Sequence, residues 1–343
     1  MQNSFPYRLV QMKFRLHILL SLLVSISVQF TIEAAEPEDY IRIHQTPEGE
    51  IQLQVAVREF TPTDKSPKNA PAVSLVGVAH IGDKTYYQGI QTYLAGQDYV
   101  LFEGVGFYPT RKQRLKRKAW AGNFGKGAAK QSPQYKMAKS LGLTYQLMEI
   151  DYNQEHFYNS DLSLGEFMEY FQPGNENSLI TGDPQKDREA KQFMAMMAGT
   201  SIVANAMQGI LQFFGKSPKF QGVAKLVLIE TLGQLGNEMS NPKNLPEEVS
   251  GLMRMIITKR NRVVLQDLKT FLREKEMDSI SIFYGAAHMM DLEKKIIQNH
   301  GYKPNGNQWM TCFSVDPKKS GLSALDINFV RRLVQRQLKL FSN

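Results

Sequence analysis

The sequence predicts an α/β fold: a mostly parallel sheet of two related strand–helix halves, with flanking helices and one helical insertion. Two apolar stretches, at 73–80 and 281–288, each end in a glycine and, three positions later, a histidine. A third apolar stretch, at 98–104, carries Glu103 near its end. Stretches this short and this apolar are typical of strands buried on both faces, as in parallel sheets covered by helices.

The phrase Gly-x-Ala-His-x-x-Asp occurs twice, at 77–83 and at 285–291. Each copy stands between an apolar strand and a predicted helix, and its aspartate is placed to begin that helix. We interpret the pair as a weak internal repeat of two strand–helix units. Because sites in parallel sheets form just beyond the carboxyl ends of the strands, we expect His80, Glu103 and His288 to converge on one crevice.

The remaining elements follow from the hydrophobic pattern. Apolar and polar residues alternate at 51–57, which predicts a half-exposed strand near a sheet edge. Further strands are predicted at 145–151 and 308–315. Helices are predicted at 83–94, 134–141, 247–272, 291–298 and 325–341, and the methionine-rich helical insertion at about 187–245.

The first 35 residues have the layout of a signal peptide. Basic residues up to Arg15 precede an apolar core at 16–28, and the small residues Ala34 and Ala35 follow. We therefore expect an exported protein, periplasmic or extracellular. Because Glu33 lies next to the expected cleavage site, a membrane anchor formed by an uncleaved signal is the alternative. The rest divides into a leader with an edge strand at 36–72 and the α/β domain at 73–343.

Composition and charge narrow the class of protein. Hydrophobic residues make up 42% of the chain and charged residues 22%, which is typical of a globular protein. The net charge is +8, and part of it lies in a basic run at 111–118. This run is either a solvated helix face or a contact with a membrane surface. Nucleic-acid binding is not expected in an exported protein. The single cysteine, Cys312, excludes an internal disulfide.

Two histidines and a carboxylate suit a divalent transition metal with an open position for water. Such a metal lowers the pKa of its bound water and polarises a carbonyl group. A helix N-terminus beside each histidine would favour the neutral ring that a ligand requires. Taken singly, each histidine also fits a structural hydrogen bond, and Glu103 fits a helix cap or an ion pair. Glu149 and Asp151 are weaker candidates, because acids at strand ends are common.

Arg260 has a functional and a structural interpretation. In the first it orients Glu103 or binds a substrate carboxylate. In the second it is a surface charge on a long helix. The sequence resembles the TraB/PrgY/GumN group over 73–302. The resemblance rests on Arg260 and Asn261, on Glu103 and on the two glycine–histidine phrases. That group includes the Tiki proteases and is placed with the ChaN and erythromycin-esterase-like folds. The resemblance implies metal-dependent peptide hydrolysis. In this sequence it implies His80 and His288 as metal ligands, Glu103 as ligand or general base, and Arg260 in support.

Three functions follow as hypotheses. The first is an exported metal-dependent hydrolase, peptidase-like, that uses Mn, Co or Zn and acts on a peptide or small-molecule substrate. The second is a metal-free esterase with His80 or His288 as general base. The third is a binding protein without turnover, for haem or a peptide. A haem would need an accessible ligand, for which Tyr284 or the methionine-rich helices are the candidates.

Overall fold

The computed structural model describes residues 39–104, 129–170, scattered positions from 172 to 188, 217–240, 247–274 and 276–341. Residues 39–343 form one compact unit. The predicted signal peptide, the basic run at 111–118 and most of the first half of the predicted helical insertion lie outside the described residues. Within them, no helix is both long enough and apolar enough to cross a membrane.

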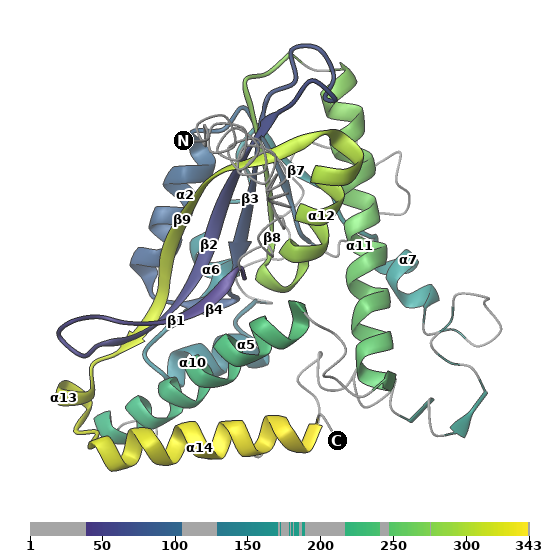
Figure 1. Cartoon of the computed structure of the whole chain (residues 1–343). Coiled ribbons are helices and arrows are strands. Elements are labelled where there is room, and N and C mark those ends of the chain that lie inside the picture. Colours follow the sequence, from purple (N-terminus) through teal and green to yellow (C-terminus); the bar gives the residue numbers. More distant parts are fainter. Residues whose placement is uncertain are drawn as a thin grey trace, which may run out of the picture. The chain divides into compact units, whose positions relative to one another are not determined.

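The centre of residues 39–343 is a seven-stranded mixed sheet (Figure 1). Its strands follow the order β1-β2-β3-β8-β5-β7, and β9 pairs with the other edge of β2. Their bounds are β1 Ile41–Gln45, β2 Ile51–Pro62, β3 Ala72–Val78, β5 Tyr99–Phe102, β7 Phe157–Asn159, β8 Ser279–Gly285 and β9 Tyr302–Val315. The strands β3, β8, β5 and β7 are parallel, whereas β1, β2 and β9 extend the sheet with antiparallel pairing. The predicted α/β fold is confirmed.

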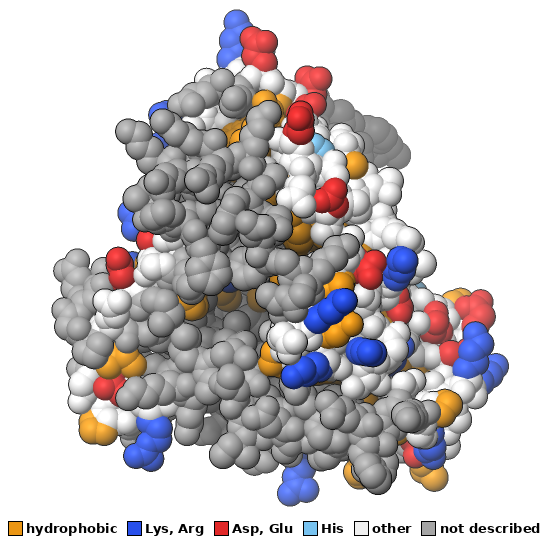
Figure 2. Space-filling model, turned by 180° about the vertical axis from the view of Figure 1, so that it is seen from behind, with side chains coloured by type: hydrophobic (Ala, Val, Ile, Leu, Met, Phe, Trp, Pro, Cys, Tyr) orange, Lys and Arg blue, Asp and Glu red, His pale blue; other side chains and the backbone are white. Residues whose placement is uncertain are grey.

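Helices cover both faces of the sheet. Figure 1 shows α2 on one side and α11 and α12 on the other. The described helices are α2 Lys84–Ala95, α5 Pro133–Ser140, α6 Gln146–Glu149, α7 Leu164–Glu169, α10 Pro218–Ser240, α11 Glu247–Glu274, α12 Met289–His300, α13 Pro317–Ser320 and α14 Ala324–Phe341. The short elements are β4 Ile81–Gly82, β6 Thr144–Tyr145 and the 3₁₀ turn η2 Ala286–His288. Figure 2 shows the opposite view, where acidic and basic side chains lie interspersed among the described residues.

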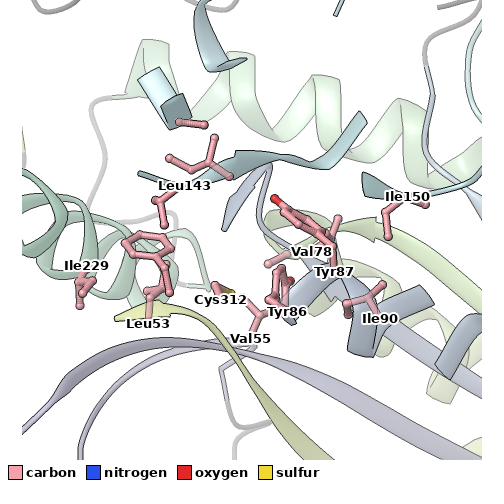
Figure 3. Packing of buried hydrophobic residues seen from close by; sticks show 14 of the residues in the cluster. Leu53, Val55, Val78, Tyr86, Tyr87, Ile90, Leu143, Ile150, Ile229 and Cys312 are labelled. Carbon is pink, nitrogen blue, oxygen red and sulfur yellow. The ribbon is translucent and has the colours of Figure 1, made fainter. Parts of the chain in front are cut away.

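The core has two parts because successive strand residues point to opposite faces. On β8, Phe283 packs in the cluster that contains α2, whereas Ile282 and Tyr284 pack in the cluster that contains α11 and α12. Figure 3 shows the α2 side, where Val78 of β3 lies among the side chains that this helix contributes. Burial on both faces explains why β3, β5 and β8 are almost wholly apolar in sequence.

Two predicted strands differ from the structure. The segment 51–57 is not a half-exposed edge: β2 pairs with β9 on one side and with β1 and β3 on the other. The buried polar residues of β2 have partners. Gln54 accepts from Arg42, and Arg58 pairs with Glu293 of α12. The segment 145–151 is not a strand. It consists of the end of β6 followed by the one-turn helix α6.

Candidate functional site

The strands β3, β8 and β5 deliver the three predicted site residues at one edge of the sheet. His80 follows β3 by two residues, Glu103 directly follows β5, and His288 ends the turn η2 after β8. Nε2 of His288 lies 3.8 Å from Oε1 of Glu103. The His80 side chain is exposed, and it lies near enough for its charge to contribute to lowering the pKa values of Glu103 and His288. The edge therefore gathers the residues that the sequence singled out.

The Glu103 carboxylate is held at both oxygens. Nη2 of Arg260 lies 2.6 Å from Oε1, and the backbone N–H of Gly285 donates to Oε2. Burial alone would raise the pKa of Glu103. The positive charge of Arg260, the nearby rings of His288 and His80, and the Gly285 hydrogen bond outweigh that effect and hold the pKa below its usual range. Glu103 is therefore a carboxylate at neutral pH.

Arg260 is buried on α11 and bridges two carboxylates. Its Nε donates to Oδ1 of Asp161 at 3.0 Å, and its Nη2 contacts both Asp161 and Glu103. Asp161 is fully buried and also accepts the backbone N–H groups of Gly104 and Leu162. The interpretation of Arg260 as a surface charge is wrong, and its geometry is that of a residue that orients Glu103. A planar guanidinium suits this bridge, since its N–H groups form a rigid fork.

The sequence reasoning missed Asp161 as part of the site, because it interpreted that residue as the start of a helix cap. The stretch 161–167 also predicts a capping box of Ser163 and Glu166, and this box is confirmed, because each side chain accepts from the other's backbone N–H group. The signal that identifies Asp161 is its place just after β7, the fourth parallel strand, at the same sheet edge as Glu103.

Asn261, the neighbour of Arg260 on α11, fixes the ring of His288. Its Nδ2 donates to the backbone oxygen of His288 at 3.2 Å and to Oδ2 of Asp291 at 2.7 Å. Both partners only accept, so Oδ1 of Asn261 is the atom that faces Nδ1 of His288, at 2.7 Å. Nδ1 must then carry the proton, which leaves Nε2 with a free lone pair on the side of Glu103.

The environment of His288 favours the neutral ring. Burial lowers the pKa of its imidazole to about 4, although the nearby Glu103 carboxylate opposes the change. The ring also packs edge-on against buried Tyr284, with 5.3 Å between centroids. At neutral pH the free lone pair on Nε2 is therefore available to accept a proton or to bind a cation.

His80 has a matching arrangement with a different amide. Its Nδ1 lies 2.9 Å from Oε1 of Gln146, whose Nε2 donates to the hydroxyl of Tyr152 at 2.6 Å. The backbone N–H of Gln146 donates to the carbonyl of His80. In this orientation of the amide, Nδ1 of His80 is the donor and its Nε2 is free. The sequence reasoning missed Gln146, because it placed this residue inside a strand.

The residue before His80 is held by two tyrosines of α2. The hydroxyl of Tyr86 accepts from the backbone N–H of Ala79, and the hydroxyl of Tyr87 donates to its carbonyl at 2.8 Å. Both tyrosines are buried in the core that Figure 3 shows. The turn that presents His80 is therefore fixed to the first helix after it.

The glycines of the two histidine phrases provide space. A Cβ on Gly285 would stand 3.1 Å from Oε2 of Glu103, and one on Gly77 would stand 2.8 Å from Cγ1 of Val55. A side chain at Gly285 would press directly on the site carboxylate. At Gly77 it would press on β2, with which the end of β3 pairs.

The weaker candidates lie elsewhere. Glu149 accepts from the hydroxyl of Thr144 at 2.8 Å, and exposed Asp151 caps the turn that follows it. Tyr284 is fully buried and donates its hydroxyl hydrogen to the carbonyl of Ser160. A haem ligand must be accessible, and Tyr284 is not.

The residues fit a divalent transition metal in their chemistry. The donor set is two imidazoles and one ionised carboxylate, and both rings are oriented through Nδ1 by an amide, as supporting residues orient metal-bound histidines. As the described side chains stand, no three or more His, Cys, Asp or Glu residues among them form a group able to hold a metal ion.

Comparison with known proteins identifies no relative: no family model, no curated protein and no solved structure matches this chain.

Proposed function

We propose that this chain is an exported hydrolase whose reaction takes place at the edge formed by His80, Glu103 and His288. One observation carries the proposal: Nε2 of His288 faces Oε1 of Glu103 at 3.8 Å, while Asn261 orients the ring through Nδ1. A neutral imidazole beside an ionised carboxylate can serve acid–base catalysis or hold a metal ion for hydrolysis.

The leading form of the proposal is a metal-dependent, peptidase-like hydrolase, as the resemblance to the Tiki proteases implies. Nε2 of His80, Nε2 of His288 and Oε1 of Glu103 would hold Mn, Co or Zn. When bound, such a metal would activate a water molecule and polarise the carbonyl of a peptide or small-molecule substrate.

The chain's own residues have defined tasks in this proposal. Asn261 and Gln146 keep the two rings in the tautomer that leaves Nε2 free. Arg260 keeps Glu103 ionised and fixed, and Asp161 holds Arg260 in place. Preorganised groups of this kind need no rearrangement during the reaction, which is how active sites gain most of their electrostatic stabilisation.

The test uses residues 36–343, purified without added metal. Elemental analysis before and after chelation measures the metal, and cleavage of a mixed peptide library measures the activity. His80→Ala and His288→Ala should each remove both while the fold survives. His44→Ala, which changes a histidine on β1, should retain both. Full metal occupancy in the His80/His288 double variant would defeat the metal-dependent form.

A second candidate is metal-free ester hydrolysis with His288 as general base. The observation that favours it is the Arg260–Glu103 contact, which already balances the carboxylate with a protein cation and leaves Nε2 of His288 free to take a proton from water. Hydrolysis of an aryl ester that survives chelation and is lost in His288→Ala would support this candidate. Loss of that hydrolysis on chelation would exclude it.

A further inference from the structure

The C-terminal helix α14 has two apolar faces. Its inner face packs on the core through buried Val330 and Val334. On its outer face the side chains of Leu325, Phe329 and Leu333 are 77%, 63% and 40% exposed. Their spacing of four residues places them in one stripe along the helix. Apart from Ile297, they are the only large hydrophobic side chains that are exposed among the described residues.

The same outer face carries two exposed arginines. Arg332 and Arg336 follow Phe329 by three and seven positions, so they flank the apolar stripe, and both are exposed. Neither forms an ion pair with any residue in the described part of the chain, and Arg332 donates only to the carbonyl of Asn328 in its own helix. By contrast, Arg331 turns inward, with its Nε 2.7 Å from Oε1 of Glu230 on α10.

We propose that the outer face of α14 docks on an anionic lipid surface. Scattered exposed apolar residues need no explanation, but a stripe of three on one helix does. Helices that lie in a membrane interface combine large apolar side chains with Arg or Lys, because the bilayer offers hydrocarbon beneath a layer of charged headgroups. Figure 1 shows α14 at the margin of the picture beside α10, with no described element on its other side.

The charges favour lipid over a second copy of the chain. A symmetric pairing of two α14 stripes would bring Arg332 and Arg336 of both copies close together. The one acidic residue of α14, Asp326, is already paired with Lys219 at 3.1 Å and would not balance them. Anionic headgroups supply that balance, and each basic residue near such a surface contributes about 1 kcal/mol to binding. The occupant that satisfies both the stripe and its arginines is therefore an anionic bilayer.

The test is co-sedimentation of residues 36–343 with vesicles. This segment omits the apolar N-terminal stretch and retains the compact unit that begins at Asp39. Vesicles of phosphatidylcholine and phosphatidylglycerol in equal parts are compared with vesicles of phosphatidylcholine alone. We expect binding to the anionic vesicles to fall about tenfold or more in Arg332→Gln/Arg336→Gln, and similarly in Phe329→Ser/Leu333→Ser.

The matched control is Lys65→Gln/Lys68→Gln, which removes the same charge from the exposed loop between β2 and β3. It should bind within about twofold of the unchanged chain, because it lies off the docking face. Circular dichroism checks that every variant keeps its fold. Absence of binding, or equal loss in the control, overturns the proposal. So does a dimer by light scattering that Phe329→Ser/Leu333→Ser converts to a monomer, since a second copy would then cover the stripe.

Discussion

Nδ1 of His288 lies 2.7 Å from Oδ1 of Asn261, and this one contact decides which nitrogen of the ring is free. The asparagine cannot be turned round, because its Nδ2 is committed to two oxygens that only accept. A fully buried asparagine thus fixes which nitrogen of His288 faces Glu103. Partners of this kind matter almost as much as the ligands or bases that they orient.

Asn261→Ala should reduce hydrolysis, and metal affinity if a metal is held, by about tenfold to a hundredfold. The reason is that His288 then loses the acceptor that selects its tautomer. Nitrogen NMR of the histidine rings should show His288 protonated at Nδ1 in the unchanged chain and a mixture in the variant. Asn328→Ala, which changes an exposed asparagine on α14, is the control and should alter neither property. An unchanged tautomer in Asn261→Ala would contradict the assignment.

Arg260→Gln should lower the free energy of unfolding by about 3–5 kcal/mol, because it leaves buried Asp161 without its cation. Urea unfolding measures this change. Arg262→Gln removes the same charge from an exposed position on the same helix, and its effect should stay within about 0.5 kcal/mol. Similar stability of the two variants would mean that the Asp161–Arg260–Glu103 chain contributes little to the fold.

Gly285→Ala should lower the hydrolytic rate by about tenfold to a hundredfold with little loss of stability. The backbone at Gly285, with φ −52° and ψ 138°, admits alanine, so the added methyl acts only by displacing the Glu103 carboxylate. The rate and the unfolding transition are measured together. Gly89→Ala is the control: its methyl would meet only Met310, at 3.9 Å, and α2 should gain about 0.5–1 kcal/mol. Full activity in Gly285→Ala would show that a methyl group at this position does not disturb the Glu103 carboxylate.

Cys312 should not react with a thiol reagent at pH 8 while the chain is folded. Burial raises the pKa of its thiol to about 12, so at pH 8 only about one molecule in ten thousand carries the reactive thiolate. Reactivity should rise only as the pH approaches that value, or at once when urea unfolds the chain. Absorbance with Ellman's reagent measures both. Rapid reaction of the folded chain at pH 8 would show that this part of β9 opens to solvent.

Local pattern was sufficient for the parallel strands and for the positions of His80, Glu103 and His288 just after three of them. Apolar runs at β3, β5 and β8 have no other stable interpretation, and residues that follow parallel strands meet at one edge. Most helix bounds were also predicted closely, including α2 and α11. These features depend on neighbours in the sequence, so the sequence alone carries them.

Features that depend on distant partners could not be predicted in this way. Gln54 and Arg58 alternate with apolar residues as on an exposed edge, and only their pairing with Thr311 and Glu293 buries them. From its neighbours in sequence, Arg260 fits a solvated charge equally well. Only its contact with Asp161, 99 positions away, explains why it is buried. Gln146 lies in a strand-like pattern, but its backbone N–H donates to the carbonyl of His80 and its side-chain oxygen contacts the ring of His80. In each case a long-range polar contact overrides the local preference.

The place of β8 between β3 and β5 also governs the order in which this molecule can assemble. The strands that precede His80 and Glu103 are not joined to each other until residues 279–285 insert between them. A nascent chain that ends before this segment lacks both β8, which joins β3 to β5, and His288, which follows β8. The candidate site at the sheet edge therefore forms late in synthesis, after most of the polypeptide has emerged.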